Sequence, residues 1–343
     1  MKYLIILALI ISACTMKNEN SPNEGNIITL SNGKIEAKVL LNGGGGLVTF
    51  SNFKSENVLL SDESLWNNDL LTNTDKYDEP KFYPFSGHIN WVGPQSEWWT
   101  QQNEFPKLKE QKSVWPPDPY LVLGDYKLLN KTETLVKLIS PKSKYSGVQF
   151  TKEYIINDDS SLDLILEMEN IRDTEVSWDI WFNTRMNGFC KVYVPIATES
   201  DLRLEYRNGA GQEPINHIIE NGFFSFIPEK PAHGKTEKVA KSFIYPNENR
   251  IYAFTENEML VIEFDRYNRE LTHPEQGMIE IFNSIRDTGD ALLELEYHSP
   301  YYKLESGESK LSKERWYLDK YNGSNSMEDH IAKINSWEIN FNK

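Results

Sequence analysis

Hydrophobic and polar residues alternate with a period of two along much of this chain. In the clearest run, Leu162, Leu164, Leu166 and Met168 alternate with neighbours that are mostly acidic. This spacing is typical of a β-strand that buries one face and exposes the other. Further runs of this kind occur at residues 148–156, 178–186, 251–255, 259–265, 277–282 and 291–298. The pattern therefore predicts a protein made chiefly of antiparallel strands.

Turn-forming residues separate these runs and help to define the fold class. The Asn32-Gly33 pair lies between residues 27–30 and 34–41, which is a strong signal for a β-hairpin. One amphipathic segment, at 326–336, predicts a helix. No repeat of constant period and no low-complexity linker divides the chain after residue 26. We therefore expect a single all-β domain at 27–343, built as a large antiparallel sandwich or barrel.

The N-terminus has the parts of an export signal. Lys2 supplies a positive charge, residues 3–11 are apolar, and small residues precede Cys14. The apolar stretch is too short to span a bilayer as a helix. The arrangement resembles a bacterial lipoprotein signal, which implies that residues 1–13 are removed and that Cys14 is lipidated.

Residues 14–26 are polar and without pattern, which suits a flexible tether between a lipid and a folded domain. Because Thr15 is not an acidic retention signal, the resemblance favours the outer membrane of a bacterial cell envelope. With Cys14 lipidated, Cys190 has no partner for an intramolecular disulfide, so it is expected to be a buried thiol.

Charge and ligand spacing argue against two classes of function. The net charge is −15, and no run of Lys and Arg offsets it. Such a field repels the phosphates of nucleic acid, so nucleic acid is not an expected partner. No ligand pair has the spacing of a zinc site, so a metal-dependent hydrolase using His88, Glu97 and Asp118 is only an alternative. No cofactor is expected.

Residues 87–118 contain four of the nine tryptophans and are punctuated by glycine and proline, so they cannot form one long helix or strand. Pyranose rings stack on indoles, while amides, imidazoles and carboxylates bind sugar hydroxyls. The segment therefore predicts a sugar site, and the alternative is that some tryptophans plug the end of the sandwich. Its candidate ligands are Trp91, Gln95, Trp98, Trp99, Trp115 and Asp118.

Two predicted strands carry polar groups at every second position, where they share one face. The first row consists of Asp179, Trp181, Asn183 and Arg185. The second row consists of Glu294, Glu296 and His298. Each row is either a solvated outer face or the floor of a groove, in which close carboxylates would raise a pKa and prepare a proton transfer. In the groove, Asn183, Arg185 and His298 are candidate substrate ligands.

Three segments follow one another near the C-terminus: a glutamate-bearing strand at 292–300, a Leu-Glu-Ser-Gly-Glu-Ser turn at 304–309 and a tryptophan-containing strand at 314–318. In this order they resemble the closing strands of galactose mutarotase-like, or aldose 1-epimerase-like, domains. Residues 87–95 resemble an uncharacterised bacterial branch of that superfamily. The resemblance covers about residues 27–320 and implies a large antiparallel β-supersandwich whose concave face holds a mono- or oligosaccharide.

The resemblance also implies a mechanism. Mutarotases open and reclose a sugar ring with a glutamate base and a histidine acid, and the base falls on the late strand, at Glu296 or Glu294. His88 is the candidate acid, with His273 and His298 as alternatives. Residues 181–185 do not carry the Thr-x-His-x-Tyr-like motif of true mutarotases.

The sequence thus favours an envelope lipoprotein that binds carbohydrate on a concave β-sandwich face. It leaves open whether the protein is also a sugar epimerase of the aldose 1-epimerase type. The alternatives are a glycan-binding lipoprotein without catalysis and an accessory to polysaccharide-processing enzymes.

Replacement of Cys14 tests the predicted anchor. We expect Cys14→Ser to move the protein from the membrane fraction to the soluble fraction of a bacterial host, because the acyl chains can no longer be attached. Fractionation followed by immunoblotting measures the change, and Cys190→Ser should leave the protein with the membranes. A wild-type chain found in the soluble fraction would contradict the prediction.

Overall fold

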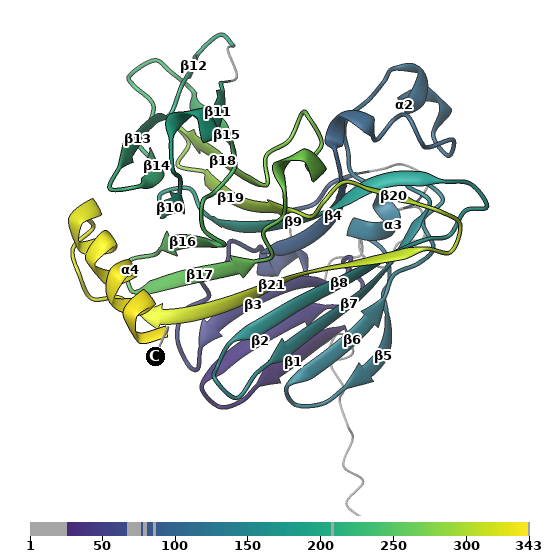
Figure 1. Ribbon diagram of the computed structural model, residues 1–343, viewed down its shortest axis with the longest axis horizontal. Helices are drawn as coiled ribbons and strands as arrows, with labels where there is room; N and C mark the ends of the chain where they lie inside the picture. The colour runs from purple at the N-terminus through teal and green to yellow at the C-terminus, as the bar shows by residue number, and fades with distance from the viewer. Residues whose placement is uncertain (1–25, 67–76, 78–80, 85–86, 207–208, 342–343) are drawn as a thin grey trace, which may run out of the picture.

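The computed structural model describes residues 26–66, 77, 81–84, 87–206 and 209–341, and shows two large β-sheets packed against each other (Figure 1). The first sheet has eleven strands, in the order β1-β2-β3-β4-β9-β19-β18-β15-β11 with β12 beside β15 and β20 beside β9. The second sheet has ten strands, in the order β13-β14-β10-β16-β17-β21-β8-β7-β6-β5. Among the described strands only β12 and β15 pair in parallel. The predicted antiparallel β-sandwich is confirmed.

The strands vary from two to twelve residues in length. Those of the first sheet are β1 (Ile27–Ser31), β2 (Ile35–Leu40), β3 (Gly46–Asn52), β4 (His88–Gly93), β9 (Val176–Asn187), β11 (Leu202–Glu205), β12 (Gln212–Glu213), β15 (Glu237–Ile244), β18 (Ile279–Arg286), β19 (Ala291–His298) and β20 (Tyr302–Leu304). Those of the second sheet are β5 (Lys127–Lys131), β6 (Leu135–Ile139), β7 (Val148–Ile156), β8 (Leu162–Asn170), β10 (Lys191–Pro195), β13 (Asn216–Glu220), β14 (Phe223–Ile227), β16 (Arg250–Phe254), β17 (Glu258–Phe264) and β21 (Ser309–Lys320).

Helices are few. They are η1 (Glu63–Leu65), η3 (Gln95–Glu97), α2 (Pro106–Glu110), α3 (Pro119–Val122), η4 (Glu199–Asp201), η5 (Arg269–Leu271) and α4 (Met327–Phe341). The predicted helix at 326–336 is confirmed as α4, which extends five residues further. It continues because Trp337 and Phe341 stack at 4.6 Å and the guanidinium of Arg250 lies over both rings. In the described part of the chain, no helix is long and apolar enough to span a membrane.

The alternating pattern located the strands well. The runs at 148–156 and 291–298 coincide with β7 and β19, and the Asn32-Gly33 turn joins β1 to β2 in an antiparallel hairpin. The run at 277–282 was placed too early, because β18 begins at Ile279 and continues to Arg286. Gly277 stays outside the strand, where its backbone N–H donates to the side chain of Glu280.

The sequence predicted that the tryptophan-rich segment is a loop, but part of it forms a strand. Residues His88–Gly93 form β4, which pairs with β9 in the interior of the first sheet, and all six residues are buried. The polypeptide turns away from the sheet at Pro94, and η3 begins at the next residue, Gln95. The segment therefore contributes a structural strand as well as the connections that cover the sheet.

The core between the sheets contains ionisable groups among its apolar side chains. Lys152 donates to the backbone oxygen of Gly44 at 2.8 Å, and burial lowers the pKa of this lysine to about 7. Glu314 accepts a hydrogen bond from Trp316 Nε1 at 2.8 Å, and burial raises the pKa of this glutamate to about 8. Each group therefore costs stability when it is charged.

Replacement of Glu314 tests this cost. Between its ordinary pKa of 4.5 and about 8, the folded chain keeps a proton on Glu314 that the unfolded chain releases, so stability is lost as the pH rises. The slope for one proton is about 1.4 kcal/mol per pH unit. We expect Glu314→Gln to be more stable than the wild type at pH 8, with the advantage shrinking toward pH 5.

Urea unfolding at pH 5, 6.5 and 8 measures this difference. Glu305→Gln is the control, because Glu305 is exposed at the surface. An advantage of Glu314→Gln that did not change with pH would show that Glu314 is not buried in its protonated form.

Candidate functional site

The two polar rows predicted from the sequence lie side by side on the face of the first sheet that points away from the core. β9 and β19 are antiparallel neighbours, and Glu296 lies opposite Asn183 in their register. The combined row consists of Asp179, Trp181, Asn183, Arg185, Glu294, Glu296 and His298. Six of these seven residues are buried and Glu294 is partly buried, so the row is not a solvated outer face.

Lys241 of β15 extends over this face and joins two glutamates. Its Nζ lies 2.6 Å from Oε2 of Glu280 and 3.0 Å from Oε2 of Glu296. Glu280 belongs to β18 and lies opposite Glu296 in the strand register. The side chain of Lys241 is 23% exposed, whereas those of the two glutamates are 3% and 1% exposed. One ammonium group is therefore shared by two buried carboxyl groups.

The two glutamates differ in their tendency to hold a proton. Burial, and then the like charge of Glu280, raise the pKa of Glu296 well above its ordinary value, despite the attraction of Lys241. Burial also acts on Glu280, but the charges of Lys241 and His298 outweigh it and lower the pKa of Glu280. Burial would lower the pKa of Lys241, yet the two carboxylates raise it. The cluster thus favours an ionised Glu280, a protonated Glu296 and a charged Lys241.

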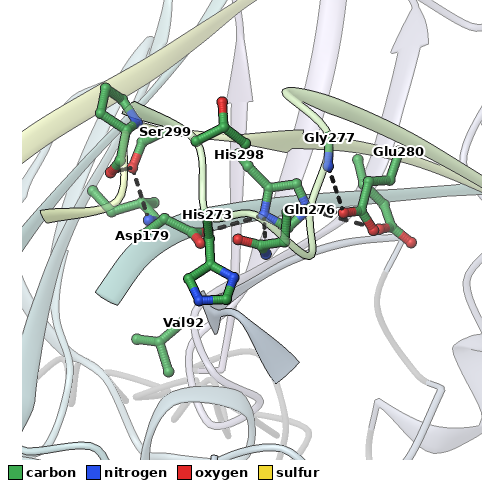
Figure 2. A network of polar contacts seen from close by, with 12 residues as sticks. Val92, Asp179, His273, Gln276, Gly277, Glu280, His298 and Ser299 are labelled. Atoms are coloured by element: carbon green, nitrogen blue, oxygen red, sulfur yellow. Dashed lines mark hydrogen bonds and ion pairs between the residues drawn. The ribbon is translucent and has the colours of Figure 1, made fainter. Parts of the chain in front are cut away.

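His298 lies between Asp179 and Glu280 (Figure 2), and its ring is completely buried. Its Nδ1 is 3.0 Å from Oδ1 of Asp179 and 2.8 Å from Nε2 of Gln276. Its Nε2 lies 3.6 Å from Oε1 of Glu280 and has no hydrogen-bond partner among the described residues. Burial raises the pKa of Asp179, although the histidine beside it opposes that shift. With a proton on Nδ1, His298 donates to Asp179, which holds the imidazole in place with Nε2 facing Glu280.

A cavity of about 650 Å³ opens in front of this cluster. Its floor includes Trp181, Lys241 and Glu280, which come from β9, β15 and β18. Its walls come from segments at 94–96, 203–206 and 274–276. Neither Glu296 nor His298 lines the cavity. The floor therefore offers a ligand a carboxylate, an ammonium and an indole ring, and the walls add further polar groups such as Gln95 and Arg203.

The same cluster has the composition of a metal site. Ligand atoms of Glu280, Glu296 and His298 lie within 4.8 Å of one another. The ammonium of Lys241, however, already lies within 3.0 Å of both carboxylates. A cation could take its place only if the lysine side chain moved outward, so the arrangement fits proton transfer better than metal binding.

His88 and Asp118 lie elsewhere, which corrects their predicted positions. His88 points from the opposite face of β4 into the core, where its ring meets Trp316 at 5.1 Å and its Nδ1 is 2.8 Å from Thr184 Oγ1. Burial lowers its pKa well below the ordinary value. Asp118 caps α3 and accepts hydrogen bonds from Ser143 and Ser146 within the interior. Neither side chain can contact a ligand in the cavity.

The predicted tryptophans divide between packing and exposure. Trp98 is 1% exposed and donates from Nε1 to the backbone oxygen of Val92, so for this residue the alternative of a structural plug fits. Trp91 packs edge-on against Trp181 at 4.7 Å. Trp115 is 45% exposed, and Trp99 lies beneath the ammonium of Lys112 and outside the cavity. Gln95 lines the cavity, and its Nε2 donates to the backbone oxygen of Val114 at 2.9 Å.

Several buried polar atoms on this face lack hydrogen-bond partners in the part of the chain that the structure describes. They are Nε1 of Trp91 and Trp181, Oδ2 of Asp179, both amide atoms of Asn183, Nε of Arg185, Oε1 of Gln276 and Nε2 of His298. An unpaired buried group costs about 1 to 3 kcal/mol of stability. Such groups are rare in native proteins, and their concentration on one face marks it as a site that keeps bonding capacity for something else.

Sequence reasoning missed Lys241, Glu280 and Gln276, and it did not choose Asp179 from its row. Glu280 gave a signal that could have been used. It is a charged residue between Met278 and Phe282, which share its face of a predicted strand. Lys241 gave no such signal, since residues 237–244 do not alternate cleanly. Its role depends on Glu280 and Glu296, which lie 39 and 55 residues further along the chain.

A family model described as a domain of unknown function (DUF4380) matches residues 26–319. The chain belongs to the DUF4380 family. A search of the curated proteins found no match to the chain.

Solved structures resemble the chain at low sequence identity. A galactose mutarotase-like protein from Clostridium acetobutylicum is 12% identical, with 86% of this chain and 95% of that chain covered and a TM-score of 0.52. Another, from Lactobacillus casei, is 12% identical, with 85% and 100% covered and a TM-score of 0.50. A TPR-domain containing protein from Parabacteroides distasonis is 14% identical, with 87% and 48% covered and a TM-score of 0.52. The DUF4380 chain therefore has the galactose mutarotase-like fold that its closing segments predicted.

Proposed function

We propose that this protein binds a sugar in the cavity above Glu280 and exchanges its anomers by acid–base catalysis. The observation that carries the proposal is the pair formed by Glu280 and Lys241, a proton acceptor and a proton donor 2.6 Å apart on the cavity floor. The indole of Trp181 also lines the cavity, with the ammonium of Lys241 5.1 Å from its ring centroid. The fold shared with galactose mutarotase-like proteins supports the same class of reaction.

The two side chains can act together on the anomeric centre. The carboxylate of Glu280 takes the proton of the anomeric hydroxyl, and the electron pair of that O–H bond forms the aldehyde carbonyl. The bond between C1 and the ring oxygen breaks, and the ring oxygen takes a proton from the ammonium of Lys241. Rotation about the C1–C2 bond and reversal of these transfers give the other anomer and restore both side chains.

The remaining members of the cluster hold this pair ready. Glu296, which the sequence favoured as the base, lies behind Lys241 and keeps its own proton, so only one full negative charge faces the ammonium. His298 faces Glu280 from the buried side, where it favours the ionised carboxylate. In this proposal Glu280 takes the role of base and Lys241 takes the role of acid that was expected of a histidine.

Other parts of the functional prediction remain proposals. Carbohydrate as the partner follows from the cavity chemistry, and anchoring to the envelope follows from the N-terminal signal. Residues 1–25, which include Cys14, lie outside the described residues. A glycan-binding protein without catalysis would need the indole and the hydrogen-bonding groups but no donor–acceptor pair with separated pKa values.

Replacement of the pair tests the proposed chemistry. We expect Glu280→Gln and Lys241→Met each to lower kcat/KM for anomer exchange by about 10² to 10⁴, because each removes one proton transfer. Polarimetry of freshly dissolved α-D-glucose and α-D-galactose, followed by proton NMR, measures the rate above the spontaneous reaction. Lys238→Met is the control, since Lys238 lies on the same strand but pairs with Glu229 outside the cavity. A wild type that binds a sugar without accelerating exchange would contradict catalysis and leave a glycan-binding protein.

The pH dependence gives an independent check. Glu280 must be ionised, and its pKa lies below the ordinary 4.5, so activity should fall only as the pH drops below that value. Lys241 must be charged, and its pKa lies above the ordinary 10.5, so activity should fall only above that value. We therefore expect kcat/KM to be flat from about pH 5 to about pH 10. A fall near pH 6 to 7 would point instead to a titrating histidine as the acid.

A further inference from the structure

The polar row on β9 continues beyond the cavity. Trp181 lies on the cavity floor, whereas Asn183 and Arg185, further along the same face of the strand, do not line the cavity. Asn183 is completely buried, and neither atom of its amide has a hydrogen-bond partner in the described ranges. Nε of Arg185 is also without a hydrogen bond, although it lies 3.4 Å from Oε1 of Glu294. This stretch keeps donors and acceptors that the folded chain does not use.

Aromatic side chains cover these groups. The ring of Phe82 lies 5.6 Å from the guanidinium carbon of Arg185 and packs edge-on against Trp91 and Trp115 at 5.9 and 5.1 Å. Phe82 itself is only partly buried. Phe82 is therefore a ring near the surface, and access of a ligand to the guanidinium of Arg185 requires it to move aside.

The uncovered groups would suit a sugar hydroxyl network. Asn183 offers a donor and an acceptor, Arg185 offers donors, and Glu294 offers an acceptor. The positive charge of Arg185 is balanced by Glu294, so the stretch favours a neutral ligand over a phosphate or a carboxylate. The indoles of Trp91 and Trp181 lie beside these groups, and their Nε1 atoms are also unpaired among the described residues.

Length decides how much ligand the row can hold. Trp181 and Arg185 are four residues apart on one strand, which corresponds to about 13 Å. This is longer than a single pyranose ring, so a sugar unit above Trp181 and Glu280 leaves Asn183 and Arg185 free for a second unit. We propose that Asn183, Arg185 and Glu294 form a second sugar subsite, and that the substrate is a neutral oligosaccharide whose reducing unit lies in the cavity. This inference rests on the proposed function.

A second buried asparagine provides a direct contrast. Asn170 on β8 is also completely buried, but its amide donates to the backbone oxygens of Thr174 and Leu304 and accepts from Arg172 N–H. An asparagine buried for structural reasons is bonded in this way. Asn183 has no such bonds. Removal of its amide should therefore change the stability of the free protein little and weaken the binding of the ligand strongly.

Paired substitutions test the subsite. The probes are maltose, cellobiose and lactose, each compared with its reducing monosaccharide, D-glucose, and binding is measured by isothermal titration calorimetry. We expect at least one disaccharide to bind ten times more tightly than D-glucose. Asn183→Leu should weaken that binding at least tenfold while it raises the temperature of thermal unfolding or leaves it unchanged. Asn170→Leu should lower the unfolding temperature and keep the affinity, and Asn170→Ser replaces it if the leucine variant does not fold.

The outcomes separate this inference from the proposed function. Binding of a disaccharide that Asn183→Leu abolishes, without accelerated anomer exchange, would support the subsite and overturn the catalytic proposal alone. Exchange of monosaccharides with no gain from a second unit would overturn the subsite alone. Asn183→Leu that lowers the unfolding temperature as Asn170→Leu does would also overturn the subsite, because it would show that the amide has a structural role. No binding of any of these sugars would overturn both.

Discussion

The candidate site depends on the ammonium of Lys241, which lies between the carboxyl groups of Glu280 and Glu296. Two carboxyl groups this deeply buried could not both ionise without a positive partner, because the desolvation of each charge is not repaid. The lysine stabilises one negative charge and leaves the other group protonated. Loss of one member of a buried ion pair typically costs about 3 to 5 kcal/mol, so the cluster ties three strands of the sheet together as well as preparing their chemistry.

The large features of this protein could be predicted from local sequence because they depend on local periodicity. The runs that became β7 and β19 alternate without interruption, and each residue's face follows from its neighbours. The same rule placed Glu294, Glu296 and His298 together on one face of β19, and Asp179, Trp181, Asn183 and Arg185 together on one face of β9. That the two rows lie side by side depends on one further fact, which the sequence does not contain: β9 and β19 are neighbours.

The failures have one physical origin, which is long-range strand order. His88 was grouped with the glutamates because it is a histidine in a segment rich in tryptophan, but the register of β4 with β9 turns its ring toward the opposite sheet. Asp118 seemed a sugar ligand because it is polar beside aromatic residues, yet two distant serines use its carboxylate. Lys241 was missed because its meaning comes from strands that follow it much later in the chain. Side-chain type alone could not settle any of these three positions.

The cavity has a floor made of paired strands, and its walls combine β11 with two segments outside the strands. A floor residue such as Lys241 cannot change position without disturbing the hydrogen-bonded ladder on either side of its strand. Arg203 and Glu205 belong to β11 and pair with β15 in this ladder, whereas the wall segments at 94–96 and 274–276 lie outside the strands. The shape of the cavity can therefore change through substitutions at 94–96 and 274–276, while the strand ladder keeps Lys241 and Glu280 beside each other.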